Sequence, residues 1–258
     1  MDYLKNILVS KKKYKPAVFK KTMAAGEGFI KNFNRDKINI IAEIKKASPS
    51  AGLINPNLDP RQAACQYGRY SSFIKGISVL TEPLYFGGCP DDIKKVKGSC
   101  CLPVLRKDFI IYAQQVHESA CLGADAILLI AGLLGTRKLK SLYRLAKSLG
   151  LEVLVEAHNR KQLNKALKIG ASLIGINNRN LKDLKTDTDN SVSLVNEFRG
   201  EADITIISES GIGSLDDILS LYGKGIRNFL IGTHFMRAKS LEAALSCMEI
   251  AFKGRGLV

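Results

Sequence analysis

The sequence predicts an α/β fold in which eight parallel strands, each followed by a helix, close into a single (β/α)8 TIM barrel. Eight short apolar segments recur at intervals of roughly 20 to 40 residues, about one strand–helix unit each. They are rich in Ile, Leu and Val without strict polar alternation, as expected of parallel strands covered on both faces. No GxGxxG motif follows the first segment, which argues against the alternative of a doubly wound open sheet.

Each predicted strand is one of these apolar segments. In chain order the strands are Asn39–Ile44, Gly76–Thr81, Leu102–Arg106, Ala126–Ile130, Leu151–Glu156, Ser172–Ile176, Asp203–Ser208 and Arg227–Ile231.

Capping residues mark several of the helices between the strands. Asp59 and Pro60 suit the N-cap and the first position of the helix that follows the first strand. Thr136 is predicted to be the N-cap of a helix that has leucines along one face, and Gly150 is predicted to end that helix. Ser214 predicts the N-cap of the helix after the seventh strand. We expect residues 1–37 to form an additional helical segment, and residues 38–258 to form the barrel of the same single domain.

Composition excludes several classes of protein. Hydrophobic residues make up 46% of the 258, enough for a full core. No apolar stretch is long enough to span a membrane, and Met1–Lys21 lacks the apolar core of a secretory signal, so we expect a cytoplasmic protein. The six cysteines show no CxxC pair, and no HxH or HExxH occurs, so we expect reduced thiols and no metal site.

The net charge of +15 allows two interpretations, nucleic-acid binding or an anionic substrate. Most lysines are spread over the predicted surface helices, and no RNP, zinc-finger or KH signature accompanies them. We therefore expect no nucleic-acid partner.

Polar side chains gather at the carboxyl ends of the predicted strands, where barrel enzymes place their active sites. Glu43 and Lys45 are two residues apart, so they point the same way at the end of the first strand. A single pair of this kind can also be a purely structural ion pair. Polar residues at the ends of several strands that converge on one face of the barrel favour an active site instead. The candidates are Glu43, Lys45, Thr81, Glu82, Lys107, Glu156, Asn177, Arg179, Glu209 and Ser210.

Glycines after the last two strands indicate a phosphate site. Gly211 and Gly213 open a helix after the seventh strand, and Gly232 with Thr233 follows the eighth. Backbone N–H groups in such turns bind phosphate well. The other interpretation is that these are ordinary turn glycines. The motif predicts a phosphorylated substrate and says nothing about the reaction.

The motifs together resemble the indole-3-glycerol-phosphate synthase family of tryptophan biosynthesis. The run Glu43-x-Lys45-x-x-Ser48-Pro49-Ser50 is the most specific feature. The matching stretches occur in family order at 41–50, 77–81, 85–88, 104–109, 174–179, 207–211 and 229–232. The resemblance implies a carboxy-lyase without cofactor that acts on 1-(o-carboxyphenylamino)-1-deoxyribulose 5-phosphate. A ring carbon attacks the ribulose carbonyl, carbon dioxide leaves, and loss of water forms the indole.

The resemblance also implies roles for individual residues. Lys107 is the general acid of ring closure, work that suits an ammonium if neighbours lower its pKa. Glu156 is the general base of the dehydration, and Lys45 contacts a substrate carboxylate or hydroxyl. Glu43 and Asn177 orient the lysines and the departing hydroxyl. The implied phosphate contacts are Ser48, Gly211, Gly232 and Thr233. Other implied polar contacts to the substrate are Arg179, Glu209 and Ser210. The implied pocket for the anthranilate ring is formed by Pro49, Phe86, Phe109, Leu128 and Leu181.

Further expectations follow from the same resemblance. The N-terminal segment lies over the barrel mouth, and the protein works as a monomer. Thr233 replaces the usual serine but keeps the hydroxyl, whereas Pro83 stands where a polar residue is expected. One alternative is another sugar-phosphate barrel such as phosphoribosylanthranilate isomerase, which would need a cysteine where Glu43 stands. The other is a basic binding protein that has lost catalysis, and the intact lysines and Glu156 argue against it.

Overall fold

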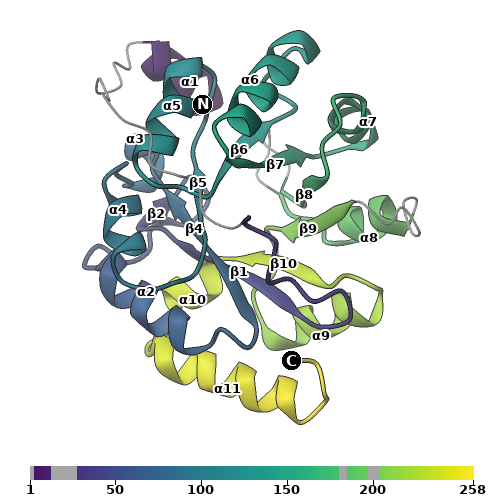
Figure 1. Cartoon of the computed structure of the whole chain (residues 1–258). Coiled ribbons are helices and arrows are strands. Elements are labelled where there is room, and N and C mark those ends of the chain that lie inside the picture. Colours follow the sequence, from purple (N-terminus) through teal and green to yellow (C-terminus); the bar gives the residue numbers. More distant parts are fainter. Residues whose placement is uncertain (1–2, 13–27, 180–184, 197–203) are drawn as a thin grey trace.

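Eight parallel strands close into a barrel in this computed structural model, which describes residues 3–12, 28–179, 185–196 and 204–258 (Figure 1). The strands are β1 (Asn39–Ile44), β4 (Ile74–Leu80), β5 (Val104–Lys107), β6 (Ala126–Ile130), β7 (Glu152–Ala157), β8 (Leu173–Asn177), β9 (Thr205–Glu209) and β10 (Asn228–Ile231). β1 pairs with both β4 and β10, which closes the sheet. The predicted barrel is confirmed, and every predicted strand overlaps an observed one.

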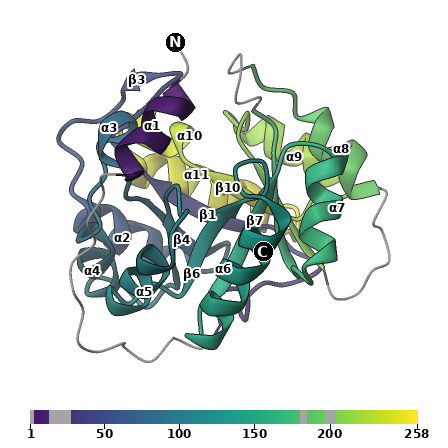
Figure 2. The same cartoon turned by 90° about the horizontal axis from the view of Figure 1, so that it is seen from above.

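Helices surround the barrel and cover its outer face (Figures 1 and 2). They are α2 (Pro60–Arg69), α4 (Asp92–Lys97), α5 (Ala113–Cys121), α6 (Thr136–Ser148), α7 (Arg160–Lys168), α8 (Asp189–Asn196), α9 (Leu215–Gly223) and α11 (Leu241–Lys253). Shorter elements lie in the loops after strands: the hairpin β2 (Ala47–Ser48) and β3 (Gly52–Leu53), α3 (Pro83–Phe86) and α10 (Thr233–Arg237). No helix in the described ranges has the length and apolar character needed to cross a membrane.

Two of the three predicted N-caps are confirmed. The Asp59 side chain accepts a hydrogen bond from Arg61 N ahead of Pro60, and the Ser214 side chain accepts one from Asp217 N. The prediction for Thr136 was wrong, because Gly135 is the N-cap of α6 and Thr136 is its first residue. Extended backbone at Gly135 begins the helix without any side-chain bond.

The barrel has two apolar cores. The larger lies between the strands and the surrounding helices, and it includes Ile40 and Ile44 of β1. The smaller fills the barrel interior, and Ile41 of the same strand belongs to it. Because side chains alternate along a strand, the residues in line with Ile41 also point into the barrel. Glu43 is therefore directed toward the axis at the carboxyl end of β1.

Helix α1 (Tyr3–Lys12) contacts the loops at the carboxyl ends of β4 and β5 (Figure 2). Ile7 is fully buried in the interior core, and the amide of Asn6 donates to the hydroxyl of Tyr85 in α3 at 3.1 Å. Lys11 Nζ lies 2.6 Å from Asp108 Oδ1, with both side chains at most 3% exposed. The sequence places Asp108 directly after Lys107, so this ion pair ties α1 to the polar residues at the end of β5.

We expect Lys11→Met to lower the free energy of unfolding by about 1–3 kcal/mol, because it leaves a buried carboxylate short of one cation. The loss stays below that of a fully unpaired charge, since Arg106 still contacts Asp108. Urea unfolding measures the effect. Lys94→Met is the matched control, because Lys94 and Asp91 form an exposed pair worth less than about 1 kcal/mol. If the two variants lose equal stability, the buried pair does not anchor α1.

Candidate active site

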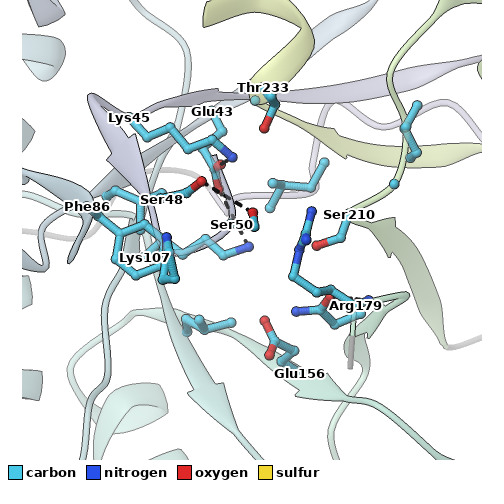
Figure 3. A pocket seen from close by; sticks show the side chains of 18 of the residues that line it. Glu43, Lys45, Ser48, Ser50, Phe86, Lys107, Glu156, Arg179, Ser210 and Thr233 are labelled. Carbon is cyan, nitrogen blue, oxygen red and sulfur yellow. Dashed lines mark hydrogen bonds and ion pairs between the residues drawn. The ribbon is translucent and has the colours of Figure 1, made fainter. Parts of the chain in front are cut away.

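A cavity of about 300 Å³ opens at the carboxyl ends of the strands (Figure 3). Of the residues predicted from the sequence, sixteen line it: Glu43, Lys45, Ser48, Pro49, Phe86, Lys107, Phe109, Leu128, Glu156, Asn177, Arg179, Ser210, Gly211, Gly213, Gly232 and Thr233. Glu209 is fully buried against Lys107. Leu181 lies outside the described residues. The cavity is in the size range of small-molecule sites.

Strand alternation explains why the polar residues converge. Leu105, Leu154 and Ile207 belong to the interior core, each on a different strand. Two residues further along stand Lys107, Glu156 and Glu209, so each polar side chain lies one layer above an apolar one and points to the same axis. The apolar layer closes the barrel below, and the polar layer forms the cavity floor.

The polar floor is a chain of ion pairs centred on Lys107. Its Nζ lies 2.5 Å from Glu209 Oε2 and 3.6 Å from Glu43 Oε2. The other oxygen of Glu43 lies 2.7 Å from Lys45 Nζ. Figure 3 shows Glu156 across the cavity from Glu43 and Lys45, with Lys107 reaching into the space between them. Two ammonium groups and three carboxylates thus share one small volume.

These contacts set the charge state of the site. Burial lowers the pKa of Lys107, but the charges of Glu209, Glu43 and Glu156 outweigh it and raise the pKa above its ordinary value. Burial likewise opposes ionisation of Glu43, yet Lys45 and Lys107 bring its pKa below the ordinary value. The expectation that neighbouring groups lower the pKa of Lys107 and so make it a better general acid is therefore wrong. Its neighbours are carboxylates, which hold the ammonium charged.

Glu209 carries the opposite perturbation. Burial raises its pKa from 4.5 to about 7, and the attraction of Lys107 only partly offsets the effect. Its second oxygen, Oε1, is buried without a hydrogen-bond partner among the described residues. A carboxyl group with a raised pKa binds its proton more tightly in the folded protein than in the unfolded chain. Its contribution to stability therefore falls as the pH rises from 4.5 through about 7.

We expect Glu209→Gln to become more stable relative to the wild type as the pH rises from about 5 to about 8, by on the order of 2 kcal/mol. Glutamine does not ionise, so the variant avoids the cost of the buried charge. Urea unfolding at several pH values measures the difference. Glu249→Gln is the control, because it removes a carboxylate on the outer helix α11, away from the cavity. A constant difference for Glu209→Gln would contradict the raised pKa.

Two glycines make room for the carboxylates. A methyl group at Gly175 of β8 would collide with Oε1 of Glu209, and one at Gly232 would collide with Oε1 of Glu43. The sequence predicts a phosphate contact for Gly232 and gives no role to Gly175. Gly175 could have been found from the sequence, because it is a glycine inside a buried strand and faces the same side as Asn177, two residues further on.

We expect Gly175→Ala to lower kcat at least about tenfold, because the methyl group forces the Glu209 carboxylate away from Lys107. The barrel still forms, since the colliding atom is the far end of a side chain. Steady-state kinetics measures the effect. Gly135→Ala is the control, because nothing lies within 4 Å of its added methyl group. Normal kcat in Gly175→Ala would show that the Lys107–Glu209 contact is dispensable.

One side of the cavity combines hydroxyls, glycines and a guanidinium. Ser210 has a φ of 67°, unusual for a residue other than glycine, and Gly211 follows at 79°. This backbone turns the Ser210 side chain toward Arg179 (Figure 3). The N–H of Gly213 already donates to Asp217 Oδ2 at 2.9 Å, so it does not serve an anion in the cavity. Backbone strain at a cavity edge is typical of a functional turn.

The opposite side of the cavity is apolar. The rings of Phe86 and Phe109 are tilted at 42° with centroids 6.3 Å apart, and Leu128 lies in the same wall. Glu82 is the N-cap of α3 and accepts from Leu84 N and Tyr85 N, with Pro83 at the first helical position. The unexpected proline therefore begins a helix that carries Phe86.

A buried charge network behind Lys107 was missed by sequence analysis. Arg106 is fully buried; its guanidinium lies 3.3 Å from Asp108 Oδ2 and 2.7 Å from Glu118 Oε2. Thr81 Oγ1 donates to the same oxygen of Asp108 at 2.7 Å. Burial raises the pKa of Asp108, but Arg106 and Lys11 bring it below the ordinary value. The sequence does contain a signal for this network, since three charged residues in a row (106–108) end an apolar strand. Only Lys107 of the three is among the candidates named from the sequence.

The histidines occupy different places. His117 is exposed on α5, and His234 Nδ1 lies 2.7 Å from the carbonyl oxygen of Gly213. His158 contacts Glu156 instead. Within the described part of the chain, no three or more His, Cys, Asp or Glu side chains gather in a way that would hold a metal ion.

Comparison with known proteins decides the family. Residues 9–248 match the sequence model described as indole-3-glycerol phosphate synthase. The chain belongs to the indole-3-glycerol phosphate synthase family. This confirms the resemblance seen in the sequence, and members of this family are lyases of tryptophan biosynthesis that close an indole ring with decarboxylation.

Individual relatives cover most of the chain. It is 45% identical over 216 residues to indole-3-glycerol phosphate synthase of Carboxydothermus hydrogenoformans, across 82% of this chain and 81% of that one. It is 48% identical over 206 residues to the synthase of Desulfosudis oleivorans, across 80% and 77% of the two chains. A crystal structure of KGPDC from Streptococcus mutans aligns with a TM-score of 0.62 over 84% of this chain and 98% of that one. At 14% identity, this last similarity shows the barrel fold alone.

Proposed function

We propose that this cavity converts 1-(o-carboxyphenylamino)-1-deoxyribulose 5-phosphate to indole-3-glycerol phosphate, with Lys107 as general acid and Glu156 as general base. The supporting observation is the arrangement of three chemically different walls in one cavity. Lysines and carboxylates form the floor, Phe86 and Phe109 form one wall, and the Ser210–Gly211 turn with Arg179 forms another. The substrate has a carbonyl to be protonated, an aromatic ring and a phosphate, which match these three walls.

Lys107 donates a proton to the carbonyl oxygen while the ring carbon attacks the carbonyl carbon. The raised pKa makes Lys107 a weak acid, but it also guarantees that the proton is present. The carbonyl oxygen becomes an alkoxide as the new bond forms, and an alkoxide is basic enough to take a proton from an ammonium. Glu43 and Glu209 hold the ammonium in position through the contacts at 3.6 and 2.5 Å. Carbon dioxide then leaves, and its bonding electrons restore the aromatic ring.

Glu156 acts in the dehydration that follows. It lies across the cavity from Lys45 (Figure 3), so acid and base groups flank a substrate placed between them. Glu156 removes a proton from the intermediate, and the hydroxyl group leaves as water with a proton from an ammonium. Lys45, held by Glu43 at 2.7 Å, contacts a substrate carboxylate or hydroxyl. Asn177 orients the departing hydroxyl group.

The binding roles divide along the same walls. Phosphate binds at Ser48, Gly211, Gly232 and Thr233, with Arg179 and Ser210 as further polar contacts. The anthranilate ring packs between Pro49, Phe86, Phe109 and Leu128, which all line the cavity. Leu181 keeps its proposed place in this pocket, although it lies outside the described residues. We also propose that the chain is one domain whose α1 covers part of the barrel mouth, supported by the Lys11–Asp108 ion pair.

The direct test mixes the purified protein with the substrate in buffer containing EDTA and follows indole fluorescence. The chain has no tryptophan, so its own emission does not obscure the signal. Rising emission supports the proposed reaction and its independence of metal ions. A flat trace from folded protein would refute it. We further propose that the protein is a cytoplasmic monomer. Size-exclusion chromatography with light scattering tests whether it is a monomer.

A further inference from the structure

A buried ring nitrogen beside Glu156 has no hydrogen-bond partner among the residues that the structure describes. His158 stands between β7 and α7, and its side chain is 10% exposed. Its Nε2 atom is buried and makes no hydrogen bond to any residue that the structure describes. The same atom lies 3.4 Å from Glu156 Oε1. A polar atom this buried and 3.4 Å from a carboxyl oxygen indicates an interaction that depends on a proton.

Gln162 of α7 decides which ring nitrogen carries hydrogen. The backbone N–H of His158 donates to Gln162 Oε1 at 2.9 Å, so that atom is the amide oxygen and not the nitrogen. The same oxygen lies 3.2 Å from Nδ1 of the His158 ring. An amide oxygen only accepts, so Nδ1 is the donor. In the neutral ring, Nε2 then presents a lone pair to Glu156.

The lone pair and an ionised carboxylate repel each other, whereas a protonated carboxyl group donates to the lone pair. The contact is therefore unfavourable before Glu156 takes up a proton and favourable afterwards. This is the behaviour that a general base needs. Other charged groups around the pair come from other strands of the barrel: Lys107 of β5, Arg179 after β8 and Glu209 of β9.

We propose that His158 is a positioning residue for Glu156, and that Nε2 accepts a hydrogen bond from the carboxyl group once Glu156 has taken the substrate proton. The inference rests on the proposed role of Glu156 as general base. In the dehydration, the bond from hydrogen to the substrate breaks and a bond from hydrogen to Glu156 forms. The electron pair left behind becomes the new double bond as the hydroxyl group leaves. The proton, held between Glu156 and Nε2, returns to solvent after product release.

Nitrogen NMR of the wild-type protein tests the tautomer directly. The chain has three histidines, so a long-range ¹H–¹⁵N spectrum is simple, and the signals missing in His158→Gln identify the ring. We expect hydrogen on Nδ1 and a lone pair on Nε2, and the same tautomer in Glu156→Gln, whose amide group donates to Nε2. In Gln162→Leu the acceptor at Nδ1 is lost, and both tautomers are expected. A wild-type ring protonated on Nε2, or on both nitrogens, would overturn the proposal.

Kinetics tests the consequence of the contact. His158→Leu is expected to lower kcat about tenfold with KM unchanged within about twofold, as for loss of one hydrogen bond formed during reaction. His158→Gln, which has an amide near the position of Nε2, is expected to recover most of kcat. The matched control is His117→Leu on the exposed face of α5, which keeps the wild-type kcat. Equal losses in the Leu and Gln variants, or a change in KM alone, would show a merely structural role. An inactive wild type would instead refute the proposed function.

Discussion

Lys107→Ala is expected to lower kcat by a factor of about 10²–10⁴, the usual contribution of a general acid. The substitution removes the group that protonates the carbonyl oxygen. It also leaves Glu209 fully buried without its partner at 2.5 Å. Binding of inorganic phosphate should be nearly unchanged, because Ser210 and Gly211 lie on another wall. Fluorescence kinetics measures kcat, and a phosphate titration measures binding.

Two further variants make the result interpretable. Lys46→Ala is the matched control, because Lys46 follows Lys45 but does not line the cavity. The double variant Lys107→Met, Glu209→Gln removes the ammonium without leaving Glu209 as an unpaired carboxylate, so it separates lost chemistry from lost stability. If Lys107→Ala retains near-normal kcat, Lys107 is not the general acid.

Glu156→Gln is expected to separate decarboxylation from indole formation. Without a general base the dehydration should slow by about 10²–10⁴, while ring closure and loss of carbon dioxide need only the acid and the binding groups. Rapid-quench experiments on a single turnover measure both products. We expect carbon dioxide to be released in the first turnover while indole fluorescence stays low.

The control for this experiment lies on the same strand. Glu152 stands at the opposite end of β7, where its carboxylate accepts from Phe29 N at 3.0 Å. Glu152→Gln keeps an acceptor there, so its kinetics should match the wild type. Equal and rapid formation of carbon dioxide and indole by Glu156→Gln would remove Glu156 from the dehydration.

Much of the fold could be predicted because its signals are local. Runs of Ile, Leu and Val mark the strands, and capping residues such as Asp59 and Ser214 mark helix starts through bonds to the next few residues. Thr136 was misplaced by one residue because glycine at position 135 also suits an N-cap, and the sequence does not choose between them. Strand alternation likewise showed that Glu43 and Lys45 point the same way, and they form an ion pair at 2.7 Å.

The sequence by itself therefore determined the barrel, the family and most of the residues that line the cavity. Apart from the pair of Glu43 and Lys45, only the tertiary structure decided which of them touch. Lys107 and Glu209 are 102 residues apart and meet only because the barrel closes. Gly175 matters because Glu209 of the next strand lies against it, and His158 matters because Gln162 orients its ring. The pKa of Lys107 is raised for the same reason, since it depends on carboxylates from three other strands. Periodicity and capping act within a few residues, whereas charge, space and proton position depend on neighbours that only the closed barrel brings together.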